Sequence, residues 1–521
     1  MIRVRKWGAA SFFLFLIAVS TQANKKVKIT VSAEPNRIHT YEGLGTSLLT
    51  PHYSNFAKET RMEMAGMLFG LPGFKYLRLW ANTDYQNDAY RFYKERGLQY
   101  EDAKEVRRNM INTGLIPESD TLILLMGPGG KVGDLRPYAK YYAWLISELQ
   151  NKYGMVTDVT GIANEPNNHD ILKAEQVPVL VKYFREELDS VGLEHVKIIA
   201  PETSNLDQIA WDMTEAIMND PEAMDALWGF STHSYNMCVT ELYGRYIQQS
   251  GKKYWQTESS ENGPEDYNDS IRAVQALARC VSDINLGVNV WIFFVGYFDY
   301  WDQDNAIKII VWHSDRGEYR PLLKYFYFRQ FCYTFDVGAE MRFCYTDLPV
   351  RPGGSHADVY MENTYGLKPP LCAAAGQNPK GDWSFTLTNM TGVYSSWAGS
   401  QYYPYQAYDV TFQAEELVAA APEKYLVMRC NDGTRNVIVD TVTMQDGAFT
   451  VTINPMDLLS IRKSFESNIP YPEYREFAPA EDYGPCGMGV GFAFIPPMGF
   501  SAAGLYRRCK RKKKRLRDSS V

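Results

Sequence analysis

Short apolar runs alternate with amphipathic stretches between residues 41 and 320. The runs are hydrophobic throughout, which is typical of strands in a parallel sheet whose two faces are both covered by helices. Seven runs are evident, at residues 76–80, 121–126, 159–163, 196–200, 227–231, 253–257 and 287–293, and a glycine-punctuated segment near Gly43 supplies an eighth. Amphipathic stretches such as 137–153 and 175–191 lie between them. We therefore predict an α/β fold with a (β/α)8 TIM barrel over residues 41–320, with a doubly wound open sheet as the alternative.

After residue 320 the pattern changes to short strands separated by turn signals, with no long helical stretch between them. Strands are predicted at residues 372–375, 383–388, 436–440 and 449–453. Turn sequences such as Asn378-Pro379-Lys380-Gly381 separate them, and residues 321–464 are therefore predicted to form an antiparallel β-sandwich. Residues 24–40 contain a further strand whose apolar positions alternate. We expect this N-terminal strand to join the sandwich, because it has no evident partner in a barrel.

The two ends of the chain have the features of an exported protein. Residues 1–23 combine a basic start, an apolar core and small residues before a cleavage position, as in a signal peptide, and the apolar run is too short to span a bilayer comfortably. Residues 465–486 are rich in Pro, Glu and Tyr, like a linker. Residues 487–521 join a mildly apolar stretch to a basic block. That pattern fits either a transmembrane segment with a basic tail or a disordered tail. Together, the features of the two ends predict a secreted or cell-surface protein.

Charge and composition narrow the function classes. The 521 residues carry a net charge of −7, which argues against nucleic acid as the main partner because phosphate binding needs a basic surface. The chain has 36 Tyr, 25 Phe and 11 Trp, which suits stacking on sugar faces, although ordinary packing explains it more simply. The eight cysteines show no metal-ligand spacing. Cys332 with Cys344 is one disulfide that the spacing leaves open.

Two glutamates stand at the ends of two predicted barrel strands. Glu165, in Asn164-Glu165-Pro166, follows the run at 159–163, and Glu258 follows the run at 253–257. They are 93 residues apart, or about three βα units, which places them on the fourth and seventh strands. Those strands face each other across the mouth of a barrel, so one carboxyl group can protonate a leaving oxygen while the other attacks the opposite face of a sugar.

With these motifs the chain resembles glycoside hydrolase family 30, the glucosylceramidase-like group in a clan of retaining β/α-barrel glycosidases. The acid/base motif of the clan resembles Asn164-Glu165-Pro166, and its nucleophile motif resembles Trp255-Gln256-Thr257-Glu258. The motifs of the family further resemble Gly43-Leu44-Gly45-Thr46, Arg78 in the second strand, His233-Ser234-Tyr235 after the sixth strand, and residues 449–455. The resemblance covers residues 25–463 and implies a side β-sandwich that includes an N-terminal strand.

The chemistry assigns roles to the pair and its neighbours. Glu165 must start protonated, which the negative charge of a nearby Glu258 favours. Glu258 must stay ionised to attack, and the charge of Arg78 helps to keep it so. Asn164 can hydrogen-bond the 2-hydroxyl of the sugar, and Tyr235 can orient Glu258. No metal or organic cofactor is needed, and we expect retention of the anomeric configuration with the carboxyl groups about 5 Å apart.

Other side chains are candidates for contact with the sugar. His233 can line the subsite, although a core position explains it nearly as well. The candidate stacking platforms are Trp80, Trp228, Trp291, Tyr297 and Trp301, and for each of them core packing is as good an explanation.

The substrate class is less constrained than the reaction. We expect a β-linked oligosaccharide or polysaccharide, with a β-1,6-linked galactan or glucan or a short β-glycoside favoured, and a glycolipid such as glucosylceramide as a further option. One alternative function is a catalytically dead barrel that binds carbohydrate, against which the intact glutamate pair argues. Another is a metal-dependent hydrolase, for which His169, near the first glutamate, has no partner at ligand spacing.

Overall fold

The structure is a computed structural model that describes residues 23–48, 53–85, 88–168, 171–235, 239–260, 269–299, 307–313, 317–346, 348, 370–392 and 404–465. The expected signal peptide, linker and C-terminal segment lie outside these ranges, apart from residues 23 and 465. Within the ranges, no helix combines the length and the apolar composition that crossing a bilayer requires.

Eight parallel strands form a closed barrel in the order β10-β3-β4-β5-β6-β7-β8-β9. Their bounds are β3 (Gly43–Leu48), β4 (Phe74–Ala81), β5 (Ile123–Pro128), β6 (Val159–Thr160), β7 (Lys197–Thr203), β8 (Gly229–His233), β9 (Lys253–Ser259) and β10 (Val290–Phe294). The last strand pairs in parallel with the first, from Val290 beside Gly43 onward. This closure confirms the predicted TIM barrel and excludes the open sheet.

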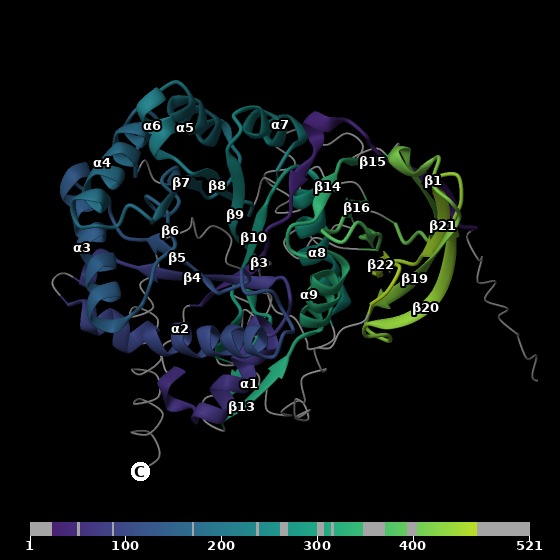
Figure 1. Ribbon diagram of the computed structural model, residues 1–521, viewed down its shortest axis with the longest axis horizontal. Helices are drawn as coiled ribbons and strands as arrows, with labels where there is room; N and C mark the ends of the chain where they lie inside the picture. Colours follow the sequence, from purple (N-terminus) through teal and green to yellow (C-terminus); the bar gives the residue numbers. More distant parts are fainter. Residues whose placement is uncertain are drawn as a thin grey trace, which may run out of the picture.

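Helices surround the barrel strands, and α8 and α9 lie between the barrel and a side domain (Figure 1). The helices are α1 (Lys58–Phe69), α2 (Ala89–Asn112), α3 (Leu135–Tyr153), α4 (Gln176–Ser190), α5 (Gln208–Met218), α6 (Pro221–Ala226), α7 (Glu241–Gln249), α8 (Ser270–Asn285) and α9 (Leu323–Thr334). Side-chain caps start several of them. Asp207 accepts the amide of Ala210 at the start of α5, and Asp269 accepts that of Arg272 at the start of α8.

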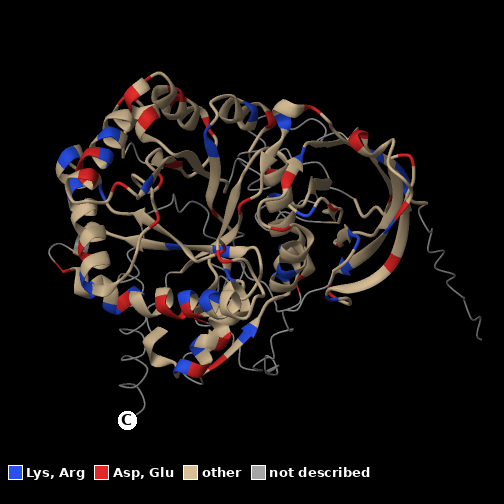
Figure 2. Cartoon of the chain, viewed as in Figure 1, with Lys and Arg blue, Asp and Glu red and all other residues tan. Residues whose placement is uncertain are grey.

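Many residues of the barrel strands are apolar because both faces of these strands are buried. Alternate residues point into the barrel, where Leu125, Ile199 and Val290 belong to one interior cluster. Their neighbours, such as Leu124 and Ile198, belong to the larger cluster between the strands and the helices. On the outer helices, acidic and basic residues are interspersed in the view of Figure 2.

Two sheets of mainly antiparallel strands form the side domain, as predicted. One sheet has the order β15-β1-β18-β21 and the other β2-β14-β16-β17-β22-β19-β20. Their strands are β1 (Lys25–Val31), β2 (His39–Thr40), β14 (Glu340–Arg342), β15 (Cys344–Thr346), β16 (Leu371–Gln377), β17 (Trp383–Asn389), β18 (Tyr408–Ala414), β19 (Glu423–Cys430), β20 (Val437–Met444), β21 (Ala448–Ile453) and β22 (Leu458–Arg462). The N-terminal strand β1 pairs in parallel with β18 along its whole length, and its alternate side chains Val27, Ile29 and Val31 are buried in the core of this domain.

Two features of this region differ from the sequence-based picture. A three-stranded sheet of β11 (Tyr297–Asp299), β12 (Ile310–His313) and β13 (Glu318–Pro321) lies between the last barrel strand and α9. Cys332 and Cys344, the candidate disulfide, are both free buried thiols. Burial raises the pKa of the Cys332 thiol to about 12, so this thiol is unreactive at neutral pH.

Candidate active site

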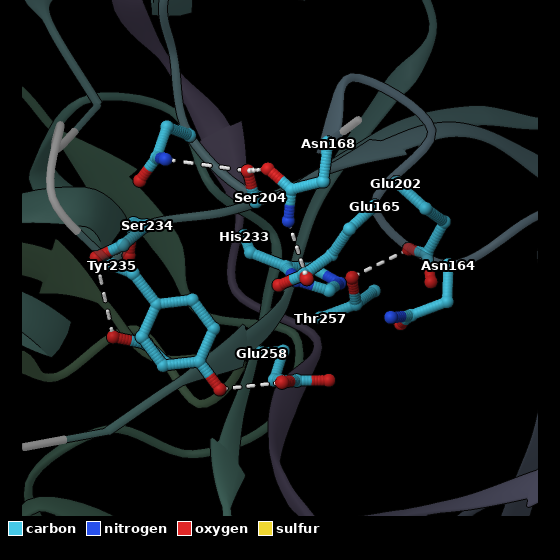
Figure 3. A network of polar contacts seen from close by, with 12 residues as sticks. Asn164, Glu165, Asn168, Glu202, Ser204, His233, Ser234, Tyr235, Thr257 and Glu258 are labelled. Atoms are coloured by element: carbon cyan, nitrogen blue, oxygen red, sulfur yellow. Dashed lines mark hydrogen bonds and ion pairs between the residues drawn. The ribbon is translucent and has the colours of Figure 1, made fainter. Parts of the chain in front are cut away.

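Side chains from four barrel strands meet at the C-terminal rim of the barrel. Arg78 comes from β4, Glu202 from β7 and Glu258 from β9, while Glu165 lies in the loop after β6. In barrel order, β6 is the fourth strand and β9 the seventh, and the carboxyl ends of parallel strands share one rim. Figure 3 shows Glu165, Glu202 and Glu258 grouped there.

The two candidate catalytic glutamates lie close enough to act on one bond. One carboxyl oxygen of Glu165, one of Glu258 and a ring nitrogen of His233 all lie within 4.8 Å of one another. The side chain of Glu165 is 15% exposed, whereas that of Glu258 is 4% exposed. Glu165 is therefore the member of the pair that is open to solvent, and Glu258 lies deeper in the barrel.

Glu258 is held by a cation and a phenol. Its Oε2 forms an ion pair with Arg78, and the hydroxyl of Tyr235 donates to its Oε1 at 2.5 Å (Figure 3). Burial raises the pKa of Glu258 above its ordinary value, and the negative charge of Glu165 raises it further. The charges of His233 and Arg78 and the hydrogen bond from Tyr235 act in the opposite direction. These three groups oppose the effect of burial and favour the ionised form of the carboxylate.

Tyr235→Phe is expected to move the acidic limb of the kcat/KM profile to higher pH. The hydroxyl stabilises the ionised carboxylate, so its loss raises the pKa of Glu258 further, and a larger fraction of Glu258 is protonated at a given acidic pH. A decrease in kcat of about 10-fold or more should accompany the shift. The measurement is kcat/KM against pH. Tyr243→Phe is the control, because it removes another buried hydroxyl, which is hydrogen-bonded to Thr214 at 2.7 Å outside this cluster. An acidic limb that stays in place in Tyr235→Phe would contradict the role of Tyr235 in stabilising the ionised Glu258.

Both carboxyl oxygens of Glu165 are held from the surrounding loops. The Nδ1 atom of His233 lies 3.1 Å from Oε1, and the amide of Asn168 donates to Oε2 at 2.8 Å. The hydroxyl of Ser204 in turn donates to the Oδ1 of Asn168 at 2.9 Å (Figure 3). The orientation of the Glu165 carboxyl group is therefore fixed. Asn168 and Ser204 were not predicted, because an asparagine in a loop and a serine after a strand carry no distinctive pattern.

Arg78 joins several parts of the site. Its side chain is fully buried and donates to the Oδ1 of Asn164 at 3.0 Å and to the Oε2 of Glu202 at 3.1 Å. Gly127, on the neighbouring strand β5, leaves room for it, since a Cβ there would lie 3.3 Å from the Nε of Arg78. The sequence indicated Arg78 and Asn164 but not Glu202, a third carboxylate in the same cluster.

Helix α8 supports the segment that carries His233 and Tyr235. Arg279 donates to the carbonyl oxygen of Ser234 at 2.5 Å, and the carboxylate of Asp283 accepts from the Ser234 hydroxyl at 3.2 Å. Arg279 and Asp283 are both fully buried. The turn after β8 is thus fixed from below, which keeps the Tyr235 hydroxyl directed at Glu258.

Trp80 and Trp291, two of the candidate stacking platforms, have different surroundings. Trp80 is half-buried near the rim, with the guanidinium of Arg78 5.0 Å from its ring centroid. Trp291 is 1% exposed, donates from Nε1 to Asp283 at 3.0 Å, and packs against Phe328. It belongs to the cluster outside the barrel because it alternates with the inward-pointing residues of β10. The structure therefore corrects the expectation of a sugar contact for Trp291 and places it in the core.

Two of the other candidate platforms, Trp228 and Tyr297, pack against aromatic side chains away from the glutamates. Trp228 immediately precedes β8, at the opposite end of the barrel, with its ring 5.3 Å from that of Trp255. Tyr297 is buried and stacks on Tyr53 at 5.5 Å. Trp301 lies outside the described residues.

Trp291→Phe is expected to lower the free energy of unfolding by about 1–3 kcal/mol and to leave KM unchanged. The change removes the indole donor of the buried carboxylate of Asp283 and opens a space in the core. Chemical denaturation and Michaelis–Menten kinetics check the two parts. Trp80→Phe serves as the contrasting variant, for which we expect a higher KM, and a rise in KM for Trp291→Phe without loss of stability would contradict the core assignment.

The side chains of Glu165, His233 and Glu258 are of types that bind metal ions. Oε2 of Glu258 already forms an ion pair with the guanidinium of Arg78. This contact leaves only the other carboxylate oxygen for a metal ion. His169, the histidine considered for a metal site, lies outside the described residues.

Comparisons with known proteins agree with this geometry. A sequence model of glycosyl hydrolase family 59 matches residues 129–291, a range that includes both Glu165 and Glu258. No curated protein matches the chain. Many solved structures share its fold.

Three similar structures illustrate that likeness. An endoxylanase of family 30 from Clostridium papyrosolvens is 12% identical with a TM-score of 0.55, and the match covers 84% of this chain and 99% of that chain. The family 30 xylanase Xyn30A from Clostridium acetobutylicum is 14% identical with a TM-score of 0.57, and the match covers 84% of this chain and 99% of that chain. The endo-β1,6-glucanase BT3312 is 14% identical with a TM-score of 0.53, and the match covers 85% of this chain and 96% of that chain.

At these identities the solved structures establish the shared fold, a TIM barrel with a β-rich side domain. The sequence motifs suggested family 30, whereas the family match is to family 59. The family match, which includes both glutamates, indicates that this chain is a glycoside hydrolase, and the glycoside hydrolases among the similar solved structures share its fold.

Proposed function

We propose that this protein is a retaining O-glycosyl hydrolase that cleaves β-linked glycans by double displacement, with Glu165 as acid/base and Glu258 as nucleophile. The observation that carries the proposal is the approach of the two carboxyl groups, whose oxygens lie within 4.8 Å. Retaining glycosidases separate their carboxyl groups by about 5–5.5 Å, whereas inverting enzymes need about 6.5–9.5 Å to admit a water molecule between them.

The surroundings of the pair support this division of roles. An ion pair with Arg78 and a hydrogen bond from Tyr235 stabilise Glu258 as an anion, as a nucleophile requires. Glu165 makes no ion pair with Lys or Arg among the described residues, and it is the more exposed of the two. It is thus suited to exchange a proton with a leaving group and then with water.

The reaction proceeds in two steps. Glu165 donates its proton to the glycosidic oxygen as a carboxylate oxygen of Glu258 attacks the anomeric carbon, which breaks the glycosidic bond and forms a glycosyl ester on Glu258. Glu165, now a carboxylate, then takes a proton from water as that water attacks the anomeric carbon and releases Glu258. The amide of Asn164, held by Arg78 at 3.0 Å, contacts the 2-hydroxyl in both steps.

The proposed substrate is a β-linked oligosaccharide or polysaccharide. The similar structures include xylanases and an endo-β1,6-glucanase. The first polysaccharides to test remain β-1,6-linked glucan and β-1,6-linked galactan, which were favoured from the sequence. A glycolipid substrate such as glucosylceramide is a further option, and the proposed membrane anchor at 487–521 lies outside the described residues. Export through residues 1–23 also remains part of the proposal, and N-terminal sequencing of the mature protein tests it.

The test is hydrolysis of aryl β-glycosides, β-glucans, β-galactans, xylan and glucosylceramide by the wild type, Glu258→Gln and a control. Glu42→Gln is a matched control, because Glu42 pairs with Lys253 at the opposite end of β9, at 2.6 Å. We expect turnover of at least one substrate by the wild type and by Glu42→Gln, with none by Glu258→Gln. Silence of the wild type on every substrate, with binding to glycans retained, would favour the carbohydrate-binding alternative.

A further inference from the structure

Glu202 is the third carboxylate of this cluster, and it contacts the surroundings of both catalytic glutamates. Its side chain is fully buried at the end of β7. Oε2 accepts from Arg78 at 3.1 Å, and Oε1 accepts from the hydroxyl of Thr257, next to Glu258, at 2.5 Å (Figure 3). The carbonyl oxygen of Glu202 accepts the backbone N–H of Glu165 at 2.9 Å.

We propose that Glu202 is a positioning residue that sets the placement of Glu165 and Glu258 and limits the effect of Arg78 on Glu258. The inference rests on the proposed function of this site and adds a residue to it. Glu202 does not take the place of either reacting group, because both of its carboxyl oxygens are already bonded and its side chain has no exposure.

The backbone supports a functional role for this contact. Glu202 has φ of +65° and Glu165 has φ of +50°, a left-handed conformation that residues with side chains seldom adopt. The hydrogen bond from the Glu165 amide joins these two residues directly. Such backbone conformations persist where surrounding structure holds them, and they concentrate at active sites.

The position of the Glu202 side chain is also prepared by the neighbouring strand. Gly161 directly follows β6, and a Cβ there would lie 3.2 Å from both Cγ and Oε2 of Glu202. A larger residue at position 161 would therefore push the carboxylate away from Arg78. Glycine at this position leaves the space that lets the buried carboxylate and guanidinium meet.

The charge arrangement gives the proposal a measurable consequence. Glu202 and Glu258 share the single positive charge of Arg78. Removing the charge of Glu202 leaves more of the Arg78 charge to act on Glu258, so the pKa of Glu258 should fall. Among the described residues, the charged or titratable groups near Glu258 are Arg78 from β4, Glu165 after β6, Glu202 from β7, and His233 and Tyr235 at the end of β8.

Two substitutions separate the charge of Glu202 from its geometry. Glu202→Gln keeps the shape and can still accept from Arg78, so the acidic limb of kcat/KM is expected to move to lower pH by about one unit, with kcat reduced about 10-fold. Glu202→Asp keeps the charge but withdraws the carboxylate from Arg78 and Thr257. For this variant we expect kcat to fall by about 10²-fold, with a smaller shift of the acidic limb than in Glu202→Gln, because the negative charge is moved but not removed.

Asp120→Asn is the matched control for the loss of a buried carboxylate. Asp120 is 6% exposed and pairs with Lys75 at 2.7 Å, near the start of β4 and so at the other end of the barrel. We expect a lower melting temperature for this variant, with the wild-type kcat and acidic limb. A Glu202→Gln limb at the wild-type pH, or a Glu202→Asp kcat equal to that of Asp120→Asn, would overturn the positioning role.

A titration that needs no turnover separates this inference from the proposed function. The ¹³C NMR signal of the labelled Glu258 carboxyl group is assigned by its absence in Glu258→Gln and followed with pH in the wild type and in Glu202→Gln. A lower Glu258 pKa in Glu202→Gln supports the role of Glu202 even if no glycoside is hydrolysed, and an unchanged pKa overturns it. Absence of hydrolysis by the wild type counts against the proposed function alone.

Discussion

Glu258→Gln is expected to lower kcat by at least about 10⁴-fold, because an uncharged amide cannot form the glycosyl ester. Glutamine fills the same space, so the residual contacts with Arg78 and Tyr235 should preserve the fold and substrate binding. Initial rates on the best aryl glycoside measure the effect, with Glu42→Gln as the control, because Glu42 pairs with Lys253 at the opposite end of β9. Activity of Glu258→Gln close to that of the control would remove Glu258 from the nucleophile role.

A smaller side chain at the same position provides a second readout. In Glu258→Ala, added azide can attack the anomeric carbon from the face that the carboxylate has vacated. The expected product is a glycosyl azide of inverted configuration, which ¹H NMR identifies. Recovery of activity by azide would show that the loss came from the missing nucleophile and not from misfolding.

Glu165→Ala is expected to discriminate between leaving groups. For alkyl β-glycosides, whose leaving oxygen needs a proton, kcat/KM should fall by about 10²–10⁴-fold. For a dinitrophenyl glycoside, whose leaving group departs without a proton, kcat/KM should change little.

The comparison of both substrates in Glu165→Ala and wild type makes the test specific. A structural defect would lower kcat/KM for all leaving groups by a similar factor. An equal loss for the alkyl and dinitrophenyl glycosides would therefore contradict the acid/base role of Glu165.

The barrel and its two motif glutamates could be predicted because their signals are local. Strands buried on both faces are continuously apolar, as in β5, where Leu124 and Leu125 point to opposite clusters. A residue just after such a strand lies at the rim, so Glu165 and Glu258 could be placed on the fourth and seventh strands by counting units. Arg78 and Tyr235 could be proposed from short motifs.

The remaining site residues depend on contacts between distant segments. Glu202 became evident only when β7 placed it against Arg78, which is 124 positions away, and Asn168 only when its loop turned toward Glu165. Trp291 was misplaced because a strand buried on both faces gives no indication of which residues point inward. The sheet of β11, β12 and β13 consists of strands of three or four residues, too short to show a period.

A double displacement by Glu165 and Glu258 is tested most directly by the anomer that hydrolysis releases first. A ¹H NMR time course with the best aryl β-glycoside distinguishes the anomers before mutarotation mixes them. We expect the β anomer to appear first and the α anomer to grow in slowly afterwards. Initial release of the α anomer would contradict it, because a single displacement by water would then replace the covalent intermediate on Glu258.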